Sequence, residues 1–356
     1  MMNYQNIVIT GGAGFAGSNL AIKLRGDYPD ATIQCLDNLK RRGSELAIKR
    51  LKENNIEFVH GDIRNKEDLE FEAIDLLIEC SAEPSVMAGI DSSPEYLLNT
   101  NLVGTINCLE LARKHNAKVV FLSTSRVYPI SYINNLAYEE TATRFNIIDS
   151  QKIVGASSQG IAENFPLDKP RSLYGTTKLA SELIINEYVD TYGMQAVINR
   201  CGVITGPWQM GKIDQGVFVL WVAKHYFKQS LSYIGYGGEG KQVRDFIHID
   251  DLYQAIHLQL EKFDDYAGGT YNIGGGLKNS VSLQELTALC QKITGNKIDI
   301  ASVKEDRPAD LRFFITDSSI FMKKSGLVWK KDAEATVRDI FEWIKENEAD
   351  LKPILS

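Results

Sequence analysis

A glycine-rich segment near the start of the chain, Thr10-Gly-Gly-Ala-Gly-Phe-Ala-Gly17, constrains the fold more than any other feature. It follows a short apolar run and precedes a helical pattern. Gly11 allows a sharp turn, Gly14 lets an anion approach the backbone, and Gly17 lets the helix pack closely on the strand. The N-terminus of the helix offers free N–H groups and the positive end of its dipole. The segment therefore predicts a strand–turn–helix unit that binds a phosphate group.

The first half of the chain alternates short apolar runs with helical patterns. The runs that read as strands are 6–10, 32–36, 57–59, 74–78 and 118–122, with a sixth at 196–199. The helical patterns between them lie near 15–26, 43–54 and 95–115. Continuously apolar strands that alternate with helices are typical of a parallel sheet covered on both faces. We therefore predict an α/β fold with a doubly wound sheet and right-handed crossovers.

The second half is less regular and predicts a smaller α/β domain. We expect the first domain to span residues 1–200, with 246–275 returning to it, and the second to span 201–245 and 276–356. A polar stretch at 129–171 is long enough to act as a lid over a site. Ser282 and Glu285 fit a capping box before an apolar helix, and 333–346 reads as the last helix.

Composition limits the class of partner. The 356 residues carry 39 basic and 46 acidic side chains, so the net charge of 39 − 46 is −7. This charge argues against nucleic acid or an anionic membrane as a partner.

The cysteines and the apolar runs bear on the compartment. The five cysteines form no CxxC pair, which predicts reduced thiols and no bound metal. No basic leader opens the chain and no apolar run could cross a bilayer, so a cytoplasmic location is expected.

A carboxylate follows the second predicted strand at the position that identifies the nucleotide. Asp37 lies twenty residues after Gly17, where an acidic side chain binds a ribose 2′,3′-diol. It predicts NAD in preference to NADP, because a 2′-phosphate would meet a negative charge. The basic residues 40–42 could instead welcome that phosphate, or form a solvated loop. Asp62 could accept a hydrogen bond from the adenine amino group or cap a helix.

Tyr174-Gly-Thr-Thr-Lys178 places a phenol and an ammonium group one helical turn apart. The ammonium charge stabilises the phenolate, so Tyr174 can act as a base near neutral pH. Thr124 directly follows the fifth predicted strand, at the sheet edge where open parallel sheets bind ligands. Its hydroxyl could bind the substrate oxygen that becomes a carbonyl, and Ser123 and Ser125 compete for that role.

Together these segments resemble the extended short-chain dehydrogenase/reductase family, the nucleotide-sugar epimerases and dehydratases. The resemblance covers nearly the whole chain and includes TGGAGFAG, HGDIRN, NLVGT, STSRVY, YGTTK, RCGVITGP, RDFIHIDD and YNIGG. It implies that Thr124, Tyr174 and Lys178 are the catalytic group. It implies NAD-binding positions at Gly11, Gly14, Phe15, Ala16, Gly17, Asp37, Asn38, Asp62, Ile63, Ser81, Asn101, Tyr174 and Lys178.

The residues after Thr124 bear on the reaction. In 4,6-dehydratases of this family the catalytic threonine is followed by Asp-Glu, whereas Ser125 and Arg126 follow it here and cannot eliminate water. This favours an epimerase. A narrower resemblance, to the CDP-tyvelose (CDP-paratose) 2-epimerases, rests on GDIRN, ETATR, DQG, GKQVRD and RPAD. It implies oxidation of a CDP-linked hexose at C2 and reduction from the opposite face.

The same resemblance suggests the residues that bind the nucleotide sugar. Arg244 and Arg307 could grip the diphosphate, because a guanidinium group bonds phosphate oxygens in pairs. Gln215 could contact the nucleotide or the sugar, and Trp208 could stack on either. Thr124 is also expected to bind the substrate, at the reacting oxygen. The alternatives for these four residues are ion pairs, a polar loop and core packing. His248 reads as a structural histidine.

Two further readings of the whole chain stay open. One is a UDP-hexose 4-epimerase or, less favoured, a dehydratase. The other is a dinucleotide sensor without catalysis, which the presence of both Tyr174 and Lys178 disfavours. The family resemblance also implies a homo-oligomer, a dimer or tetramer, formed through the helices near 95–115 and 172–192.

Overall fold

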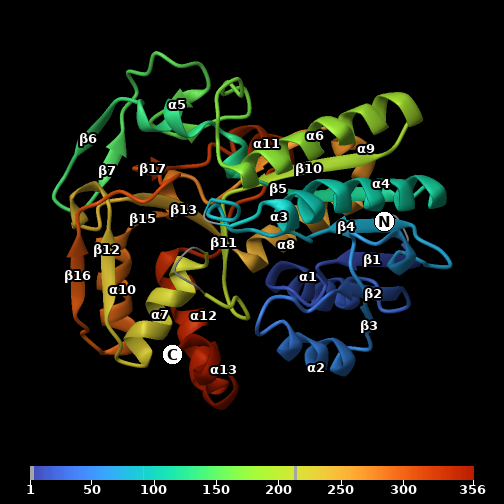
Figure 1. Cartoon of the computed structure of the whole chain (residues 1–356), viewed down its shortest axis with the longest axis horizontal. Helices are drawn as coiled ribbons and strands as arrows, with labels where there is room; N and C mark the ends of the chain where they lie inside the picture. The colour runs from blue at the N-terminus through green and yellow to red at the C-terminus, as the bar shows by residue number, and fades with distance from the viewer. Residues whose placement is uncertain (1–3, 91, 212–214) are drawn as a thin grey trace. The chain divides into compact units, whose positions relative to one another are not determined.

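The computed structural model describes residues 4–90, 92–211 and 215–356. The chain forms two compact units, each built from separate segments (Figure 1). The first unit comprises the chain up to Thr124 together with Leu173–Arg200 and Tyr253–Thr270. The second unit comprises Ser125–Ser172, Cys201–Leu252 and Tyr271–Ser356.

A parallel sheet forms the centre of the first unit, in the order β10-β5-β4-β1-β2-β3. The strands are β1 (Asn6–Thr10), β2 (Thr32–Asp37), β3 (Glu57–His60), β4 (Leu76–Glu79), β5 (Lys118–Thr124) and β10 (Ala196–Cys201). The strand β14 (Thr270–Ile273) continues the sheet order beside β10, and all but its first residue is assigned to the second unit. The predicted doubly wound parallel sheet is confirmed. β4 begins two residues later than predicted, because the Asp75 carboxylate accepts hydrogen bonds from the backbone N–H groups of Gln5 and Asn6 at 2.8 Å.

Helices cover this sheet. They are α1 (Phe15–Asp27), α2 (Glu45–Glu53), α3 (Glu95–Leu98), α4 (Gly104–His115), α6 (Leu173–Tyr192), α8 (Ile249–Glu261), which ends in this unit, and α9 (Phe263–Tyr266). α4 and α6 pack against each other and on β4 and β5 (Figure 1). Leu77, Phe121, Leu109 and Ile185 are buried in this layer. Burial of such side chains supplies much of the free energy that holds helices on a sheet.

The predicted helix near 95–115 is not one regular helix. A five-residue π-helical segment, η2 (Asn99–Val103), joins α3 to α4. Gly104 follows it, and a Cβ atom there would lie 2.4 Å from Cδ1 of Ile63. The wider turn re-aims the polar residues of the segment, as π-helical turns commonly do at functional sites.

The second unit is built around β13 (Val243–His248), which pairs with β11 (Val203–Thr205), β15 (Ser280–Ser282) and β17 (Phe313–Phe314). β12 (Leu231–Ile234) pairs with β16 (Ile300–Val303) in a separate parallel pair. The helices α7 (Val217–Tyr226), α10 (Leu283–Thr294) and α12 (Ala333–Glu346) pack together, and α11 (Ser319–Ser325) and α13 (Glu348–Leu355) complete the unit. The predicted capping box of Ser282 and Glu285 starts α10, with both hydrogen bonds present.

The polar stretch at 129–171 differs from the predicted long loop. It holds α5 (Ile130–Asn134) and two small hairpins, β6 (Tyr138–Glu140) with β7 (Phe145–Ile147) and β8 (Ala156–Ser157) with β9 (Gly160–Ile161). The stretch packs in the second unit and not, as predicted, with residues 1–200. The Phe145 N–H donates to the carbonyl of Lys241, and Ile161 bridges to Thr316. These partners lie far away in sequence, so local patterns could not reveal them.

The segment that returns to the first unit is also shorter than expected. The predicted segment is 246–275, whereas Tyr253–Thr270 is the segment that belongs to the first unit. Residues 246–248 belong instead to β13, in the sheet of the second unit. The difference arises because β13 and α8 are continuous in sequence while the division between the units falls within α8.

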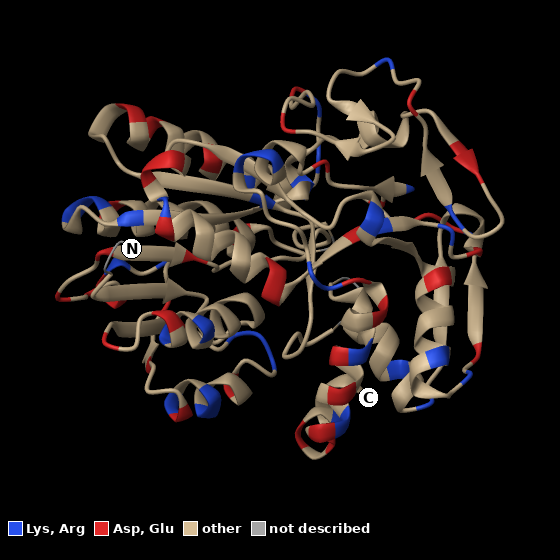
Figure 2. Ribbon diagram, turned by 180° about the vertical axis from the view of Figure 1, so that it is seen from behind, with Lys and Arg blue, Asp and Glu red and all other residues tan. Residues whose placement is uncertain are grey.

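Charged side chains lie mainly on helices and loops, with both signs interspersed, and the strands of the first unit carry few of them (Figure 2). Within the described residues, no helix combines the length and the hydropathy needed to span a bilayer.

Candidate active site

The glycine segment joins β1 to α1 as predicted. Gly11 has a φ of +65°, and a Cβ atom there would lie 2.8 Å from the carbonyl carbon of Cys80. A Cβ atom at Gly17 would lie 2.3 Å from the Gly11 oxygen. Gly14 is the N-cap of α1 and no side chain caps the helix, so the first turn, with Phe15 and Ala16, can present N–H groups to an anion. This cradle fits a dinucleotide pyrophosphate.

Asp37 ends β2 beside this loop. Its Oδ1 accepts the Leu39 N–H at 2.8 Å and its Oδ2 accepts the Ala13 N–H at 3.2 Å. Burial raises the pKa of Asp37, and the N–H donors of Leu39, Ala13 and Gly14 oppose that rise. The carboxyl group is thereby held at the end of β2, where a ribose diol is expected.

Asn38 and Asp62 meet beside Asp37 in a polar cluster. The Asn38 side chain donates to Oδ2 of Asp62 at 2.8 Å, and the Arg64 guanidinium bonds both oxygens of Asp62 at 2.9 and 2.7 Å. Burial alone would raise the pKa of Asp62, but the hydrogen bonds from Arg64 and Asn38 outweigh it and lower the pKa to about 2. Asp62 is therefore ionised at neutral pH and can still accept a hydrogen bond.

Sequence reasoning missed the aromatic residue of this cluster. The Tyr96 ring lies under two cations, with Lys40 Nζ 3.3 Å and Arg64 Cζ 4.7 Å from its centroid. Lys40 was considered only as a phosphate ligand or a solvated residue. No local signal links Tyr96 to Lys40 and Arg64, because the three lie on separate segments.

The other predicted NAD-binding residues lie near the carboxyl end of β4. Ser81 follows Cys80, next to Gly11, where a Cβ atom would be 2.8 Å from the Ser81 nitrogen. Asn101 in η2 accepts the Glu83 N–H at 2.7 Å and donates to Thr177 on α6 at 3.3 Å. Ile63 is buried against Gly104. The π-helical turn thus connects the loop after β4 to α6.

The predicted catalytic residues all belong to the first unit. Thr124 is the last residue of β5 and is 8% exposed. Tyr174 is half-buried in the first turn of α6, and Lys178 follows one turn later with 2% exposure. The Lys178 ammonium lies 3.8 Å from the centroid of the Phe121 ring on β5. The helix that carries the phenol therefore packs on the strand that carries Thr124.

A buried ion pair fixes α6 further along. Glu182, one turn after Lys178, receives hydrogen bonds from Arg200 Nη2 at 2.8 Å and from the Ser123 hydroxyl. Ser123 is therefore committed to Glu182. Ser125, the second predicted competitor of Thr124, opens a short 3-10 turn in the second unit.

The arginines predicted to bind the diphosphate share one carboxylate in the second unit. Arg244 Nη2 donates to Asp310 Oδ1 at 2.9 Å, and Arg307 Nη2 lies 3.5 Å from Asp310 Oδ2. Burial lowers the pKa of Arg244, and the charge of Asp310 opposes that effect. The Arg307 side chain is 39% exposed and that of Arg244 is 18% exposed. Arg307 is thus the more accessible cation of the two.

The remaining predicted substrate residues also lie in the second unit. Trp208 is half-buried and its ring centroid lies 5.7 Å from that of Trp343. Its φ of +73° is uncommon for a bulky side chain. Gln215 is partly buried just before α7. His248 is 2% exposed, and its Nδ1 accepts the Asp250 N–H at 3.1 Å.

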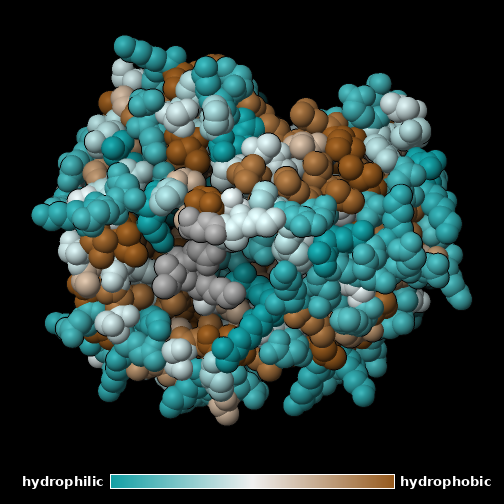
Figure 3. Space-filling model, in the orientation of Figure 1, coloured by the Kyte–Doolittle hydropathy of each residue, from teal (hydrophilic) through white to brown (hydrophobic). Residues whose placement is uncertain are grey.

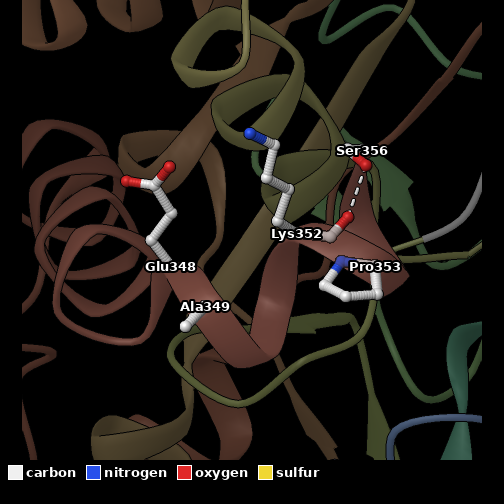
Figure 4. Close-up of a pocket in the computed structure, with 5 residues that line it drawn as sticks. All are labelled: Glu348, Ala349, Lys352, Pro353 and Ser356. Carbon is white, nitrogen blue, oxygen red and sulfur yellow. Dashed lines mark hydrogen bonds between the residues drawn. The ribbon is translucent and has the colours of Figure 1, made fainter.

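A surface hollow lies on α13 of the second unit (Figure 4). It is lined by Glu348, Ala349, Lys352, Pro353 and Ser356, all from the last helix and the residue after it. None of these residues was singled out by the sequence, and none of them is among the predicted site residues. We assign no function to this hollow.

Comparison with known proteins identifies the family. Residues 7–274 match the model of the NAD dependent epimerase/dehydratase family. The chain is 30% identical to the CDP-paratose 2-epimerase of Salmonella typhi, over 95% of this chain and 98% of that protein. It is 28% identical to the bifunctional UDP-glucose 4-epimerase and UDP-xylose 4-epimerase 1 of Pisum sativum, over 96% of each.

A solved structure agrees with this result. The dTDP-glucose 4,6-dehydratase of Bacillus anthracis, in complex with NAD, superposes with a TM-score of 0.76 at 26% identity, over 98% of this chain and 99% of that one. The Rossmann-like fold, the glycine cradle and Asp37 agree with NAD as the cofactor. The family match and these features together confirm the predicted resemblance: the chain belongs to the NAD dependent epimerase/dehydratase family, whose members act on nucleotide sugars.

Proposed function

We propose that this protein is an NAD-dependent epimerase of a nucleotide-activated hexose, with a CDP-linked hexose inverted at C2 as the favoured reaction. The observation that carries the choice of epimerase over dehydratase is the Ser125-Arg126 pair after Thr124, which offers no acid for the elimination of water. The likeness to a CDP-paratose 2-epimerase over nearly the whole chain supports the choice of substrate.

The proposed roles are those that the family resemblance implies for Tyr174, Lys178 and Thr124, which all lie in the first unit. Tyr174, as the phenolate, takes the proton of the sugar hydroxyl and returns it at the end of the cycle. Lys178 stabilises that phenolate through its charge, one helical turn away. Thr124 holds the oxygen as it becomes a carbonyl. The chemistry that NAD supplies when bound is reversible hydride transfer.

The proposed substrate residues belong to the second unit. Arg244 and Arg307 are proposed to bind the diphosphate, Gln215 and Trp208 to contact the nucleotide or the sugar. Asp310 pairs with both arginines, and the Arg307 side chain is the more exposed of the two. Binding of a phosphate by paired N–H groups is a common use of arginine.

A second candidate is a UDP-hexose 4-epimerase, which the likeness to the Pisum sativum enzyme favours. The test is to incubate the purified protein with CDP-hexoses and UDP-hexoses separately and to locate the inverted carbon by NMR. Inversion at C2 of a CDP-hexose supports the proposal, and inversion at C4 of a UDP-hexose supports the second candidate. A 4-keto-6-deoxy product would show a dehydratase and would contradict both.

We also propose a homo-oligomer formed through the helices of the first unit. Large apolar side chains are exposed there, Leu98 and Val103 on the α3–η2 segment and Leu183 and Tyr192 on α6. Figure 3 shows apolar residues gathered over α6 and α3. Apolar groups at this density on one face commonly mark an interface.

A further inference from the structure

The carboxyl end of β4 carries an acidic side chain that none of the roles above uses. Glu79 is the last residue of β4 and is 0% exposed. Directly opposite it in the register are Thr10 on β1 and Phe121 on β5, both uncharged, and Leu77 precedes it on the same face. The strands of this unit carry few charges (Figure 2). A carboxyl group buried here is costly unless its surroundings compensate for it.

Hydrogen bonding compensates for only part of that cost. The Thr105 hydroxyl on α4 lies 2.5 Å from Glu79 Oε1 and can donate its proton to it. Glu79 Oε2 is buried and has no hydrogen-bond partner among the described residues. Protonation of the carboxyl group or a nearby positive charge can supply the rest, and the structure offers such a charge.

That charge is the Lys178 ammonium. Glu79 and Phe121 are register partners on parallel strands, so their side chains project from the same face of the sheet. Lys178 Nζ lies over the Phe121 ring at 3.8 Å. The ammonium group and the carboxyl group therefore share one water-free layer beneath α4 and α6, where charges interact more strongly than in water.

Groups from three neighbouring elements face Glu79, namely α6, α4 and β1. Burial raises the pKa of Glu79, while the charge of Lys178 from α6 and the hydrogen bond from Thr105 lower it. From α4, Cys108 also faces the carboxyl group, and burial followed by the charge of Glu79 raises the pKa of that thiol, so it stays neutral. Thr10 on β1 does not titrate. Lys178 is thus the cation that responds to Glu79.

We propose that Glu79 is a positioning residue for this reaction: its carboxylate balances the buried ammonium of Lys178 and so sets the pH range in which Lys178 and Tyr174 work. This inference rests on the proposed function of those two residues. The carboxylate keeps Lys178 protonated in a buried place, and it moderates the positive field that Lys178 exerts on the phenol.

The sign of the effect follows from electrostatics. A negative charge raises the pKa of every titrating group near it, because it favours the protonated form. Loss of the Glu79 charge should therefore lower the pKa of Tyr174 and that of Lys178 together. Both limbs of the pH profile of kcat/KM should therefore move to lower pH, by about 0.5 to 1 pH unit for the loss of one nearby charge.

The test compares the NAD-bound protein with its Glu79→Gln and Glu79→Met variants. The first removes the charge and keeps the shape, and the second suits an apolar layer. The Tyr174 phenol is titrated by the ultraviolet absorbance of tyrosinate, as the difference between each protein and the same protein carrying Tyr174→Phe. The pH dependence of kcat/KM is measured on the same proteins.

Two further variants complete the design. Thr105→Val keeps the Glu79 carboxyl group but removes the hydroxyl that donates to it. The pKa of Glu79 should then rise and its negative charge should diminish. We therefore expect a smaller shift of both limbs to lower pH. Thr105→Val also serves where the Glu79 variants fail to fold. Glu53→Gln removes a carboxylate from the exposed side of α2, where it pairs with Lys49, and should leave both limbs in place.

Shifts of both limbs to lower pH support the proposal. Titration of Tyr174 at the same pH in the parent protein and in the charge-removing variants would overturn it, because Glu79 would then be neutral or too distant. The titration needs no substrate, so an error in the assigned sugar leaves it intact. Absence of any Tyr174 titration, with normal turnover of Tyr174→Phe, would instead defeat the proposed function.

Discussion

At the scale of single residues, the proposed chemistry depends on a phenol whose proton can leave near neutral pH. Tyr174 is half-buried, and Lys178 follows it by one helical turn with its ammonium over the Phe121 ring. A buried cation stabilises a nearby anion more than an exposed one does, because water screens it less. The local environment, more than the Y-x-x-x-K spacing, makes Tyr174 a credible base.

Replacing Tyr174 with Phe tests this directly. The variant keeps the ring and loses the hydroxyl, so we expect turnover to fall by about 100-fold or more while NAD stays bound. Turnover is followed by NMR of the nucleotide sugar, and NAD content by release on denaturation. Near-normal turnover by the variant contradicts the assigned role.

Asp245 predicts a pH dependence of stability at the same scale. It is 1% exposed. Burial raises the pKa of its carboxyl group to about 6, although hydrogen bonds from Thr316 and from nearby backbone N–H groups lower it. The folded protein therefore holds the Asp245 proton more tightly than the unfolded chain does. The contribution of this group to the free energy of unfolding is fully present below about pH 4 and is lost as the pH rises through about 6.

The Asp245→Asn variant should remove this dependence. Between about pH 4 and pH 7 the free energy of unfolding of the parent should fall relative to the variant by at most about 3 kcal/mol. Urea unfolding at both pH values measures it. A constant difference between the two proteins would show that Asp245 does not titrate in this range.

At the scale of elements, α6 is the part that organises the site. Tyr174, Lys178 and Glu182 repeat every four residues and share one face of the helix. On that face Lys178 lies over Phe121 and Glu182 accepts the Ser123 hydroxyl, both on β5. Glu182 is 2% exposed and pairs with Arg200, which is 7% exposed. The helix is therefore anchored by a buried ion pair one turn beyond the catalytic lysine.

Replacing Glu182 with Gln should destabilise the protein by about 3 to 5 kcal/mol, because Arg200 is left as a buried charge without its partner. Thermal or urea unfolding measures the loss. The matched control is Glu53→Gln, which breaks an exposed pair with Lys49 and should cost about 0 to 1 kcal/mol. Equal losses in both variants would mean that burial of the Glu182 pair contributes nothing.

At the scale of the whole molecule, the two units divide the proposed work. The cofactor cradle and the proposed proton-transfer group belong to the first unit, and the candidate arginines belong to the second. The first unit also exposes Leu183, at 60%, on α6. A large apolar side chain so exposed on a helix is the basis for the proposed oligomer.

Replacing Leu183 with Glu should dissociate that oligomer, since a charge at an apolar interface must lose its water. Light scattering after size-exclusion chromatography gives the mass before and after the change. Lys345→Glu on α12, an exposed charge change in the second unit, is the control and should leave the mass unchanged. A parent protein with the mass of one chain rules out the proposed oligomer.

The sequence by itself determined the parallel sheet, the glycine cradle, the position of Asp37 and the helical spacing of Tyr174 and Lys178. These features are local, because turn geometry, strand periodicity and helix periodicity are set by residues a few positions apart. The tertiary structure decided what distant residues do together. The unit that holds residues 129–171, the ion pair of Glu182 with Arg200 and the burial of Glu79 beside Lys178 depend on contacts between separate segments. Such contacts leave no periodic trace in the chain, because folding alone brings their partners together.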